Sequence, residues 1–227
     1  MDEVVVLDSG STDRTVEIAE SLGAKVRVEA FQGFVIQKNR ALELCTGDWV
    51  FNLDADEEVT PELRDSIIAA TGSFRPERST AVFRVCRRTW YLGKWIRHCG
   101  WYPEYRERLS RRGCAQWEGE MLHESLRGKG VAGRLAGDLL HRPYPSLGAH
   151  ARKIVNYTDM WARRERSKGR RAGLAELAGR PLARFMKMYF FRAGFLDGIP
   201  GFAISVMGAW YTFMKYARLY EMTRNQE

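Results

Sequence analysis

The stretch from Trp49 to Asp56 has the sequence WVFNLDAD. Its first five residues form an almost wholly apolar run, which predicts a strand buried inside a sheet. Its end carries two carboxylates, Asp54 and Asp56, separated by one residue. Two carboxylates in this position can bind one hard cation, Mg²⁺ or Mn²⁺, and leave coordination positions open for diphosphate oxygens. The alternative is a solvated acidic loop, because Glu57 and Glu58 follow directly.

Upstream of this stretch, strand and helix patterns alternate. The expected strands are residues 3–8 and 25–29, and the expected helices are residues 14–22 and 32–45. Such alternation predicts βαβ units around a parallel sheet. In open sheets of this kind, ligands lie beyond the carboxyl ends of the strands. Asp8 closes the first strand, so we expect it near Asp54 if the two strands are close in the sheet.

The rest of the chain has a different pattern. Residues 81–87 and 104–109 are expected to be strands, and an aromatic-rich loop separates them. From residue 146 onward the apolar spacing is helical. We therefore predict an α/β protein with a Rossmann-like, mostly parallel sheet covered by helices on both faces in residues 1–145. Residues 146–227 are predicted to form a helical segment.

The composition of the chain limits its function only broadly. The 227 residues carry a formal net charge of +8, which suits nucleic acid, an anionic membrane surface or phosphorylated substrates. The four cysteines form no CxxC pair, so we expect reduced thiols and no zinc site. The first residues have no basic segment followed by an apolar run, so we expect no signal peptide.

Lys38 and Asn39 are candidate binding residues on the second predicted helix. Lys38 can reach a phosphate. Asn39 lies on an otherwise apolar stripe and must find hydrogen-bond partners if it is buried. A contact with a ligand and a structural tie between helix and strand both satisfy that requirement.

His123 and Glu124 form a weaker candidate. An imidazole suits Mn²⁺, and a neighbouring carboxylate can act as a general base. A lone histidine is more often structural or exposed than catalytic. Glu118 and Glu120 are nearby alternatives for the base.

Three blocks, in their order and spacing, resemble the family-2 glycosyltransferases of GT-A fold. The blocks are residues 4–15, 37–42 and 52–57. Later features resemble the bacterial subgroup that builds lipopolysaccharide cores and related surface glycans. These are Arg108-Leu109, Gly119, His123-Glu124 and the tail from Lys153 to Tyr216.

The resemblance implies an inverting transfer of a hexose from a nucleotide sugar to a lipid-linked or lipopolysaccharide-core acceptor. UDP is the favoured nucleotide. The residues that the resemblance assigns to the nucleotide sugar are Asp8, Ser9, Lys38, Asn39 and Asp54.

The resemblance also implies a metal and a base. Asp54 and Asp56 would carry Mg²⁺ or Mn²⁺ and the diphosphate, with His123 near that metal. Glu124 would deprotonate the acceptor hydroxyl, which attacks the anomeric carbon.

One departure from the family pattern concerns the start of the chain. Family members have a strand, a loop and a helix before the strand that ends at Asp8, whereas this sequence starts at that strand. An inactive, truncated glycosyltransferase remnant is therefore an alternative expectation.

The tail predicts attachment to a membrane surface. A dense basic run over residues 163–171 lies upstream of the uncharged stretch 199–214, which is short for a spanning helix. Charge and apolar insertion together favour peripheral attachment to an anionic bilayer. We expect the protein in the cytoplasm, on the inner face of the cytoplasmic membrane. The alternative is a helical hairpin packed on the catalytic domain with its basic face in water.

Two further functions compete with the main expectation. A polyprenyl-phosphate glycosyltransferase would use the same donor site. A nucleic-acid-binding protein would explain the charge and the aromatics, but it leaves Asp54 and Asp56 unexplained and the sequence has no helix-turn-helix or RNP signature. We therefore expect no nucleic-acid partner.

Overall fold

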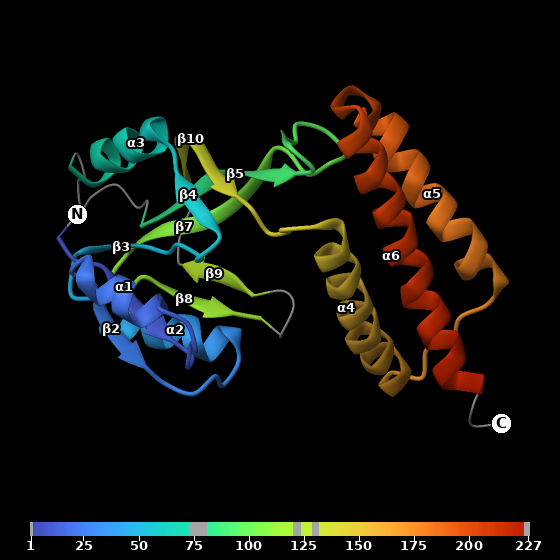
Figure 1. Cartoon of the computed structure of the whole chain (residues 1–227), viewed down its shortest axis with the longest axis horizontal. Helices are drawn as coiled ribbons and strands as arrows, with labels where there is room; N and C mark the ends of the chain where they lie inside the picture. The colour runs from blue at the N-terminus through green and yellow to red at the C-terminus, as the bar shows by residue number, and fades with distance from the viewer. Residues whose placement is uncertain (1, 73–80, 120–123, 129–131, 225–227) are drawn as a thin grey trace. The chain divides into compact units, whose positions relative to one another are not determined.

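The fold is taken from a computed structural model that describes residues 2–72, 81–119, 124–128 and 132–224 (Figure 1). The chain divides into two compact units. The first consists of Met1–Ala55, Val59–Cys86 and Tyr105–Leu139, and the second of Asp56–Glu58, Arg87–Glu104 and Leu140–Glu227.

The helices and strands follow one another in an α/β order. The elements up to residue 95 are β1 (Val5–Asp8), α1 (Thr15–Ser21), β2 (Lys25–Val28), α2 (Phe34–Leu44), β3 (Trp49–Phe51), β4 (Glu57–Val59), α3 (Pro61–Gly72), β5 (Val82–Tyr91) and β6 (Lys94–Trp95). The later elements are β7 (Glu104–Arg111), β8 (Ala115–Glu118), β9 (Ser125–Gly128), β10 (Gly133–His141), α4 (Leu147–Ser167), η1 (Ala175–Gly179), α5 (Arg180–Met186), η2 (Lys187–Phe191), η3 (Gly194–Asp197) and α6 (Ile199–Arg224). The α/β class predicted from the sequence is confirmed.

The predicted mostly parallel sheet is wrong, because the strands form a mixed arrangement. β1 pairs with β2 in parallel, whereas β3–β7, β5–β6 and β8–β9 are antiparallel pairs. The largest sheet has the order β3-β7-β5-β10-β4, with β6 paired to β5. Between β5 and β10, the described residues contain strands and loops but no helix. Antiparallel strands need only a short connection, whereas parallel neighbours need a crossover, so this region favours antiparallel pairing.

An apolar core in the first unit fixes the strand that leads to Asp54. Its buried members are Leu63, Val85, Leu109, Leu135 and Leu139, and Trp49, Phe51 and Val59 pack against them. Each such side chain contributes about 1.5–3 kcal/mol when it is removed from water. Because β3 supplies two of the packed aromatic rings, its carboxyl end has a defined position.

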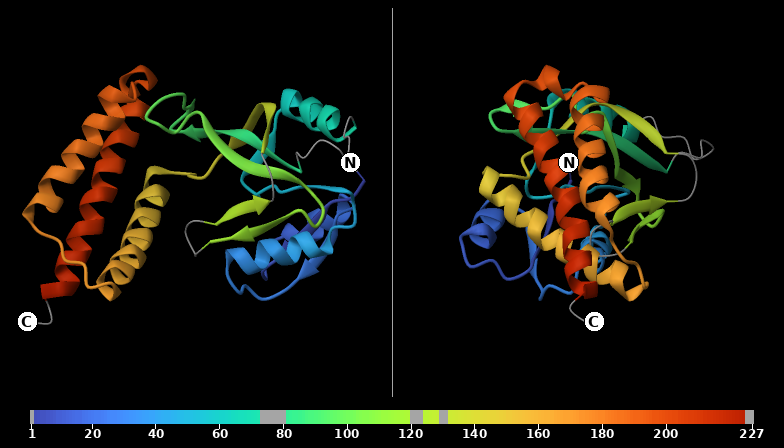
Figure 2. Two further views of the ribbon diagram at one scale, coloured as in Figure 1. Left: turned by 180° about the vertical axis from the view of Figure 1, so that it is seen from behind. Right: turned by 90° about the vertical axis from the view of Figure 1, so that its right-hand side faces the viewer.

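The second unit is built around three helices. α4 and α5 both pack against α6, and the three lie side by side in both views of Figure 2. α4 begins after Ser146, whose Oγ accepts a hydrogen bond from the Ala149 N–H. Its buried residues His150, Ile154, Thr158 and Ala162 recur every fourth position, which places them on one face. Among the described residues, no helix is both long enough and apolar enough to cross a membrane.

His150 is a titratable group inside the second unit. It is 6% exposed, its Nδ1 is 2.8 Å from the Tyr91 hydroxyl, and its ring stacks on Tyr144 with centroids 4.1 Å apart. Burial, helped by the nearby charge of Lys153, lowers the pKa of His150 to about 4. The imidazole is therefore neutral in the folded protein at pH 7.

This depressed pKa predicts a loss of stability in mild acid. The unfolded chain binds a proton at His150 near its ordinary pKa, whereas the folded chain does so only near pH 4, so stability falls as pH drops through that window. We expect the free energy of unfolding of the wild type to fall by about 2 kcal/mol more than that of His150→Gln between pH 7 and pH 4.5. Urea denaturation at the two pH values measures the difference. Equal losses in the wild type and in His150→Gln would contradict the prediction.

Candidate functional site

The indole of Trp117 organises the candidate site in the first unit. Trp117 lies in β8 and is 5% exposed. Its backbone N–H donates to Asn39 Oδ1 at 2.7 Å, and its carbonyl accepts from Asn39 Nδ2 at 2.9 Å. Its indole Nε1 donates to Asn52 Oδ1 at 3.1 Å. One residue is thus held by α2 and by the segment that follows β3. We refer to the pair of Asn39–Trp117 hydrogen bonds as the Asn39 clasp.

Two cations lie over the same indole ring. Lys38 Nζ is 4.3 Å from the ring centroid, and Arg108 Cζ is 5.8 Å from it. An indole face is negative, so it attracts both cations within this range. Trp117 therefore fixes two positive side chains that come from α2 and β7.

Asp54 lies between these two cations. Its Oδ1 is 2.9 Å from Lys38 Nζ, and its Oδ2 accepts from Arg108 Nη2 at 2.7 Å. Partial burial opposes ionisation, but Arg108 and Lys38 outweigh it and lower the pKa of Asp54 to about 2. The first carboxylate of the predicted pair is consequently ionised at any physiological pH.

Glu124 is the fourth charged residue of this arrangement. Its Oε1 is 3.7 Å from Lys38 Nζ, so Arg108, Asp54, Lys38 and Glu124 form a row of alternating charges, named here the charge row. The Arg108 side chain is 4% exposed, whereas the other three are between 21% and 32% exposed. The charge row therefore has one buried end and three members that solvent or a ligand can reach.

Asp8 and Ser9 form a separate loop beside α2. The Asp8 carboxylate is buried and accepts from the N–H groups of Gly10 at 2.9 Å and Ser11 at 2.8 Å, and from the Ser11 hydroxyl. The bonds from Ser11 hold the pKa of Asp8 below its usual value. Ser9 Oγ accepts from Gln37 Nε2 at 2.9 Å, which ties the loop to the residue before Lys38.

The expected approach of Asp8 to Asp54 depended on two neighbouring strands in one parallel sheet. The structure instead pairs β1 with β2 and assigns β3 to the six-stranded sheet. β3 is the edge strand of that sheet and pairs with β7 in the antiparallel direction.

Asp56, in the second unit, has a partner that the sequence did not reveal. Its Oδ2 is 3.3 Å from Nε2 of His141, the last residue of β10. The Arg142 N–H donates to the Asp56 carbonyl at 2.9 Å. Residues 133–141 were not recognised as a strand, so nothing in the sequence indicated that a histidine 85 positions later would meet this carboxylate.

The donor chemistry around these carboxylates is compatible with a divalent cation. No group of three or more His, Cys, Asp or Glu side chains within the described ranges is arranged to hold a metal. Mg²⁺, however, is commonly bound by one or two carboxylates, with the rest of its shell from water and substrate phosphates. Asp54, in the first unit, and Asp56, in the second, each carry a carboxylate of this kind, and His141 lies beside Asp56. His123, the third predicted ligand, lies outside the described residues, as does Glu120.

A family profile described as "Glycosyl transferase family 2" matches residues 1–118. The chain belongs to this family. It is a glycosyltransferase, and the matched region contains Asp8, Lys38, Asn39 and Asp54 but ends before Glu124.

Two similar glycosyltransferases align with almost the whole chain. The "Lipopolysaccharide core biosynthesis glycosyltransferase LpsC" of Rhizobium meliloti is 31% identical over 96% of this chain and 83% of the relative. The "Uncharacterized glycosyltransferase RT0209" of Rickettsia typhi is 30% identical over 98% of this chain and 79% of the relative. Among solved structures, residues 1–349 of S. aureus TarS align with 99% of this chain and 82% of that chain, with a TM-score of 0.39 and 14% identity.

The Asn39 clasp predicts a large effect of a small substitution. Asn39→Asp keeps an acceptor for the Trp117 N–H but sets a carboxylate oxygen against the Trp117 carbonyl. We expect a loss of about 2–3 kcal/mol in the free energy of unfolding, because a buried acceptor loses its donor. Urea denaturation measures it. Asn156→Asp, at an exposed position in α4, is the matched control and should change stability by less than about 0.5 kcal/mol; equal effects of the two changes would contradict the role of the clasp.

Proposed function

We propose that this glycosyltransferase moves a hexose from a UDP-sugar, with inversion, to a lipid-linked or lipopolysaccharide-core acceptor. The observation that carries the proposal is the charge row. It joins Lys38, Asp54 and Glu124, which come from three separate parts of the sequence. These are the side chains for which the resemblance to GT-A enzymes implies donor binding and acid–base chemistry. In this proposal residues 1–145 bind the donor, and residues 146–227 serve the acceptor and the membrane.

In this proposal the residues of the charge row have different roles in donor binding. Arg108 is almost completely buried and keeps Asp54 ionised and oriented. Lys38 is more exposed and can exchange part of its contact with Asp54 for a diphosphate oxygen. Asp8 and Ser9 are proposed to meet the uridine; the Ser9 oxygen accepts from Gln37, so its own hydroxyl proton remains available to a ribose oxygen. Asn39 acts as a positioning residue, because both of its amide atoms hold Trp117.

The transfer step uses Glu124 as the base. Its carboxylate accepts the proton of the acceptor hydroxyl, and the hydroxyl oxygen forms a bond to the anomeric carbon. The bond from that carbon to the diphosphate oxygen breaks on the opposite side, and UDP leaves with the electron pair. The added negative charge on UDP lies within reach of Lys38.

A divalent metal is the proposed cofactor. Asp54 and Asp56 are proposed to hold Mg²⁺ or Mn²⁺, with His141 as the nearest imidazole and His123 as a further candidate. A bound metal would neutralise charge on the diphosphate.

The acceptor class is supported by the relatives. One of them is described as acting in lipopolysaccharide core biosynthesis. Transfer to a polyprenyl phosphate would use the same donor residues, so the two activities are separated by assaying the two acceptor classes with one donor.

A metal-dependent donor site predicts a specific effect of Asp54→Ala on UDP binding. We expect calorimetry to detect UDP binding by the wild type in the presence of Mn²⁺. Asp54→Ala should bind at least about tenfold more weakly, because it loses a metal ligand and leaves Lys38 and Arg108 without their shared partner.

Asp65→Ala, an identical change at an exposed position in α3, is the matched control. Circular dichroism checks that all three chains are folded. UDP binding that is as tight in Asp54→Ala as in Asp65→Ala would contradict the proposed donor site.

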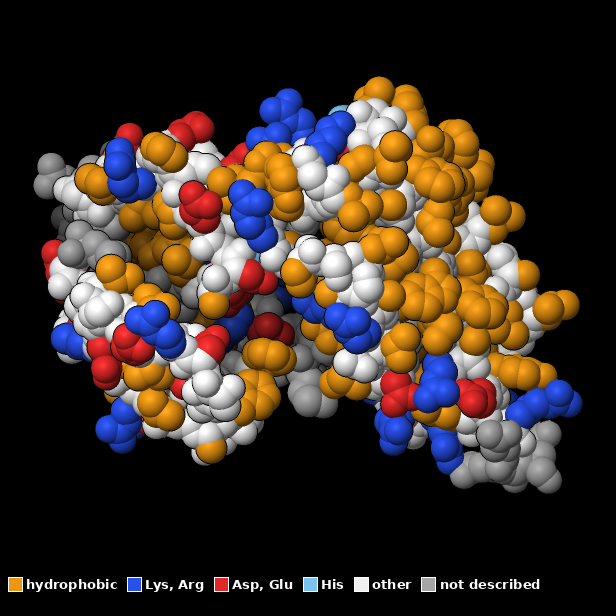
Figure 3. Space-filling view, in the orientation of Figure 1, with side chains coloured by type: hydrophobic (Ala, Val, Ile, Leu, Met, Phe, Trp, Pro, Cys, Tyr) orange, Lys and Arg blue, Asp and Glu red, His pale blue; other side chains and the backbone are white. Residues whose placement is uncertain are grey.

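The second unit has an apolar surface suited to a membrane. Figure 3 shows hydrophobic side chains gathered over the face formed by α5 and α6. Phe191 and Ile199 are 81% and 82% exposed, and Phe190, Phe195 and Phe202 are about half exposed. Isolated exposed apolar residues are ordinary, but a contiguous group of this kind is typical of an interaction surface.

The charges around this surface favour an anionic bilayer as its partner. Between Glu176 and Asp197 the chain has no acidic residue but has Arg180, Arg184, Lys187 and Arg192. Cations near an anionic leaflet contribute about 1 kcal/mol each, and apolar insertion adds to them. We therefore place the protein at the inner face of the cytoplasmic membrane in this proposal.

Vesicle binding tests the apolar surface. We expect the chain to co-sediment with vesicles of phosphatidylglycerol and phosphatidylcholine, less so with phosphatidylcholine alone or in high salt. Phe191→Ser combined with Ile199→Ser should weaken binding at least about tenfold through lost insertion. Leu22→Ser, which changes a residue 81% exposed in the first unit, should have no effect. Unchanged binding of the double variant would exclude this surface as the attachment site.

A further inference from the structure

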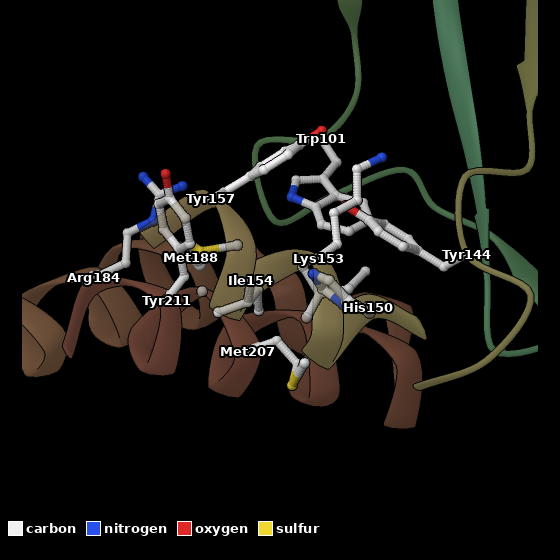
Figure 4. A pocket seen from close by; sticks show the side chains of 12 residues that line it. Trp101, Tyr144, His150, Lys153, Ile154, Tyr157, Arg184, Met188, Met207 and Tyr211 are labelled. Carbon is white, nitrogen blue, oxygen red and sulfur yellow. The ribbon is translucent and has the colours of Figure 1, made fainter. Parts of the chain in front are cut away.

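A pocket of about 210 Å³ lies entirely within the second unit (Figure 4). Its walls come from the loop before β7, the segment after β10, and the helices α4, α6 and α5 with η2. Aromatic and cationic side chains dominate the lining, with Trp101, Tyr144, His150, Lys153, Tyr157, Arg184 and Tyr211 among them. It lies outside the charge row, and the transfer chemistry proposed above does not use it.

One end of the pocket is an aromatic wall. His150 stacks on Tyr144 with ring centroids 4.1 Å apart, and Trp101 lies 6.2 Å from Tyr144 between centroids. Figure 4 shows Tyr144, His150 and Trp101 at this end and Arg184 with Tyr211 at the other. Flat aromatic faces with a polar edge suit a ligand that has both C–H-bearing faces and hydroxyl groups, as a pyranose has.

The wall also offers neutral hydrogen-bonding groups. Burial raises the pKa of Tyr144 to about 12, so its phenol keeps its proton at neutral pH. His150 is neutral because its pKa is about 4, and the bond to Tyr91 fixes the ring. Sugar hydroxyls both donate and accept, and phenol and imidazole can match either role.

The pocket is positively charged. Lys153 and Arg184 line it, and none of its lining residues is acidic. Lys153 Nζ lies over the rings of Tyr144 at 5.3 Å and Tyr157 at 5.8 Å, and within the described part of the chain neither cation forms an ion pair. Two cations without a carboxylate, in a partly enclosed site, favour an anionic ligand group.

The size of the pocket limits the ligand further. Sites for drug-sized ligands usually measure about 300–1,000 Å³. A volume of about 210 Å³ therefore suits one sugar ring with its substituent better than an oligosaccharide.

We propose that this pocket binds a single pyranose carrying a phosphate or carboxylate group, as part of the acceptor glycan. The ring packs against Trp101 at the aromatic end of the pocket, and Lys153 and Arg184 supply the positive charge that the anionic group requires. This inference rests on the proposed glycosyltransfer to a surface glycan, because it names the chemistry of the acceptor.

The test uses glucose 6-phosphate as the probe. Calorimetry should detect its binding to the full chain, and glucose and inorganic phosphate should each bind more weakly than the combined probe. Methyl-labelled methionine gives a local readout, because Met188 and Met207 line the pocket and their signals should shift. Lys153→Ala and Arg184→Ala should each weaken binding at least about tenfold.

Matched controls lie beside both residues. Arg152→Ala and Lys187→Ala remove the same charges from exposed positions that do not line the pocket, and both should bind the probe as the wild type does. Equal affinities of all four variants, or no shift of the two methionine signals, would overturn the proposal. The proposal would also be overturned if the chain bound phosphatidylglycerol vesicles, Lys153→Ala and Arg184→Ala weakened that binding, and glucose 6-phosphate did not compete with the vesicles. This result would assign the pocket to a lipid headgroup.

UDP binding in Mn²⁺ separates this proposal from the proposed function. Lys153→Ala and Arg184→Ala should bind UDP as the wild type does while losing the sugar phosphate. Loss of UDP binding in Asp54→Ala with retained sugar-phosphate binding would show that the two sites are independent. A wild-type chain that binds the sugar phosphate but not UDP would refute the donor site and leave the pocket assignment standing.

Discussion

The position of Trp117 is the constraint on which the candidate site depends. Its backbone is held by Asn39 and its indole nitrogen by Asn52, so the ring cannot turn away. The ring in turn fixes Lys38 and Arg108, and these two cations hold Asp54 ionised. Charges that must act on a ligand are more effective when they are oriented beforehand, because they need no reorganisation during the reaction.

The sequence predicted those parts of the site that lie next to one another along the chain. The apolar run before Asp54 became β3, and the helical spacing around Lys38 became α2. Arg108 and Trp117 were not recognised as site residues, because their roles depend on strand pairings that no local pattern encodes. His141 was missed for the same reason: β10 has little apolar alternation, and Asp56 is far from it in sequence. The antiparallel pairing of β3 with β7 also explains why the sheet is mixed.

The two units use charge in different ways. In the first unit each cation of the charge row has an acidic partner, and the row is nearly neutral. In the second unit Lys153 and Arg184 line a pocket without a carboxylate. Burial, with the like charges of Arg170, Arg184 and Arg180, also lowers the pKa of Lys215. Paired charges hold one another's side chains in a fixed geometry, whereas charges without an opposite partner attract a counter-ion. This contrast is why we propose that the first unit binds the donor and that the pocket of the second unit binds an anionic ligand.

The Asn39 clasp has a consequence for how this site can diverge. Both of its hydrogen bonds go to the backbone of residue 117, so they do not depend on which side chain that residue carries. Any residue except proline at position 117 could form the same two hydrogen bonds with Asn39, since proline alone lacks the N–H. The position of the backbone at residue 117 is thus independent of the chemistry of its side chain. Relatives that keep the asparagine can exchange the indole for another side chain, and so alter the charge balance around the carboxylate, without rebuilding the strand that presents it.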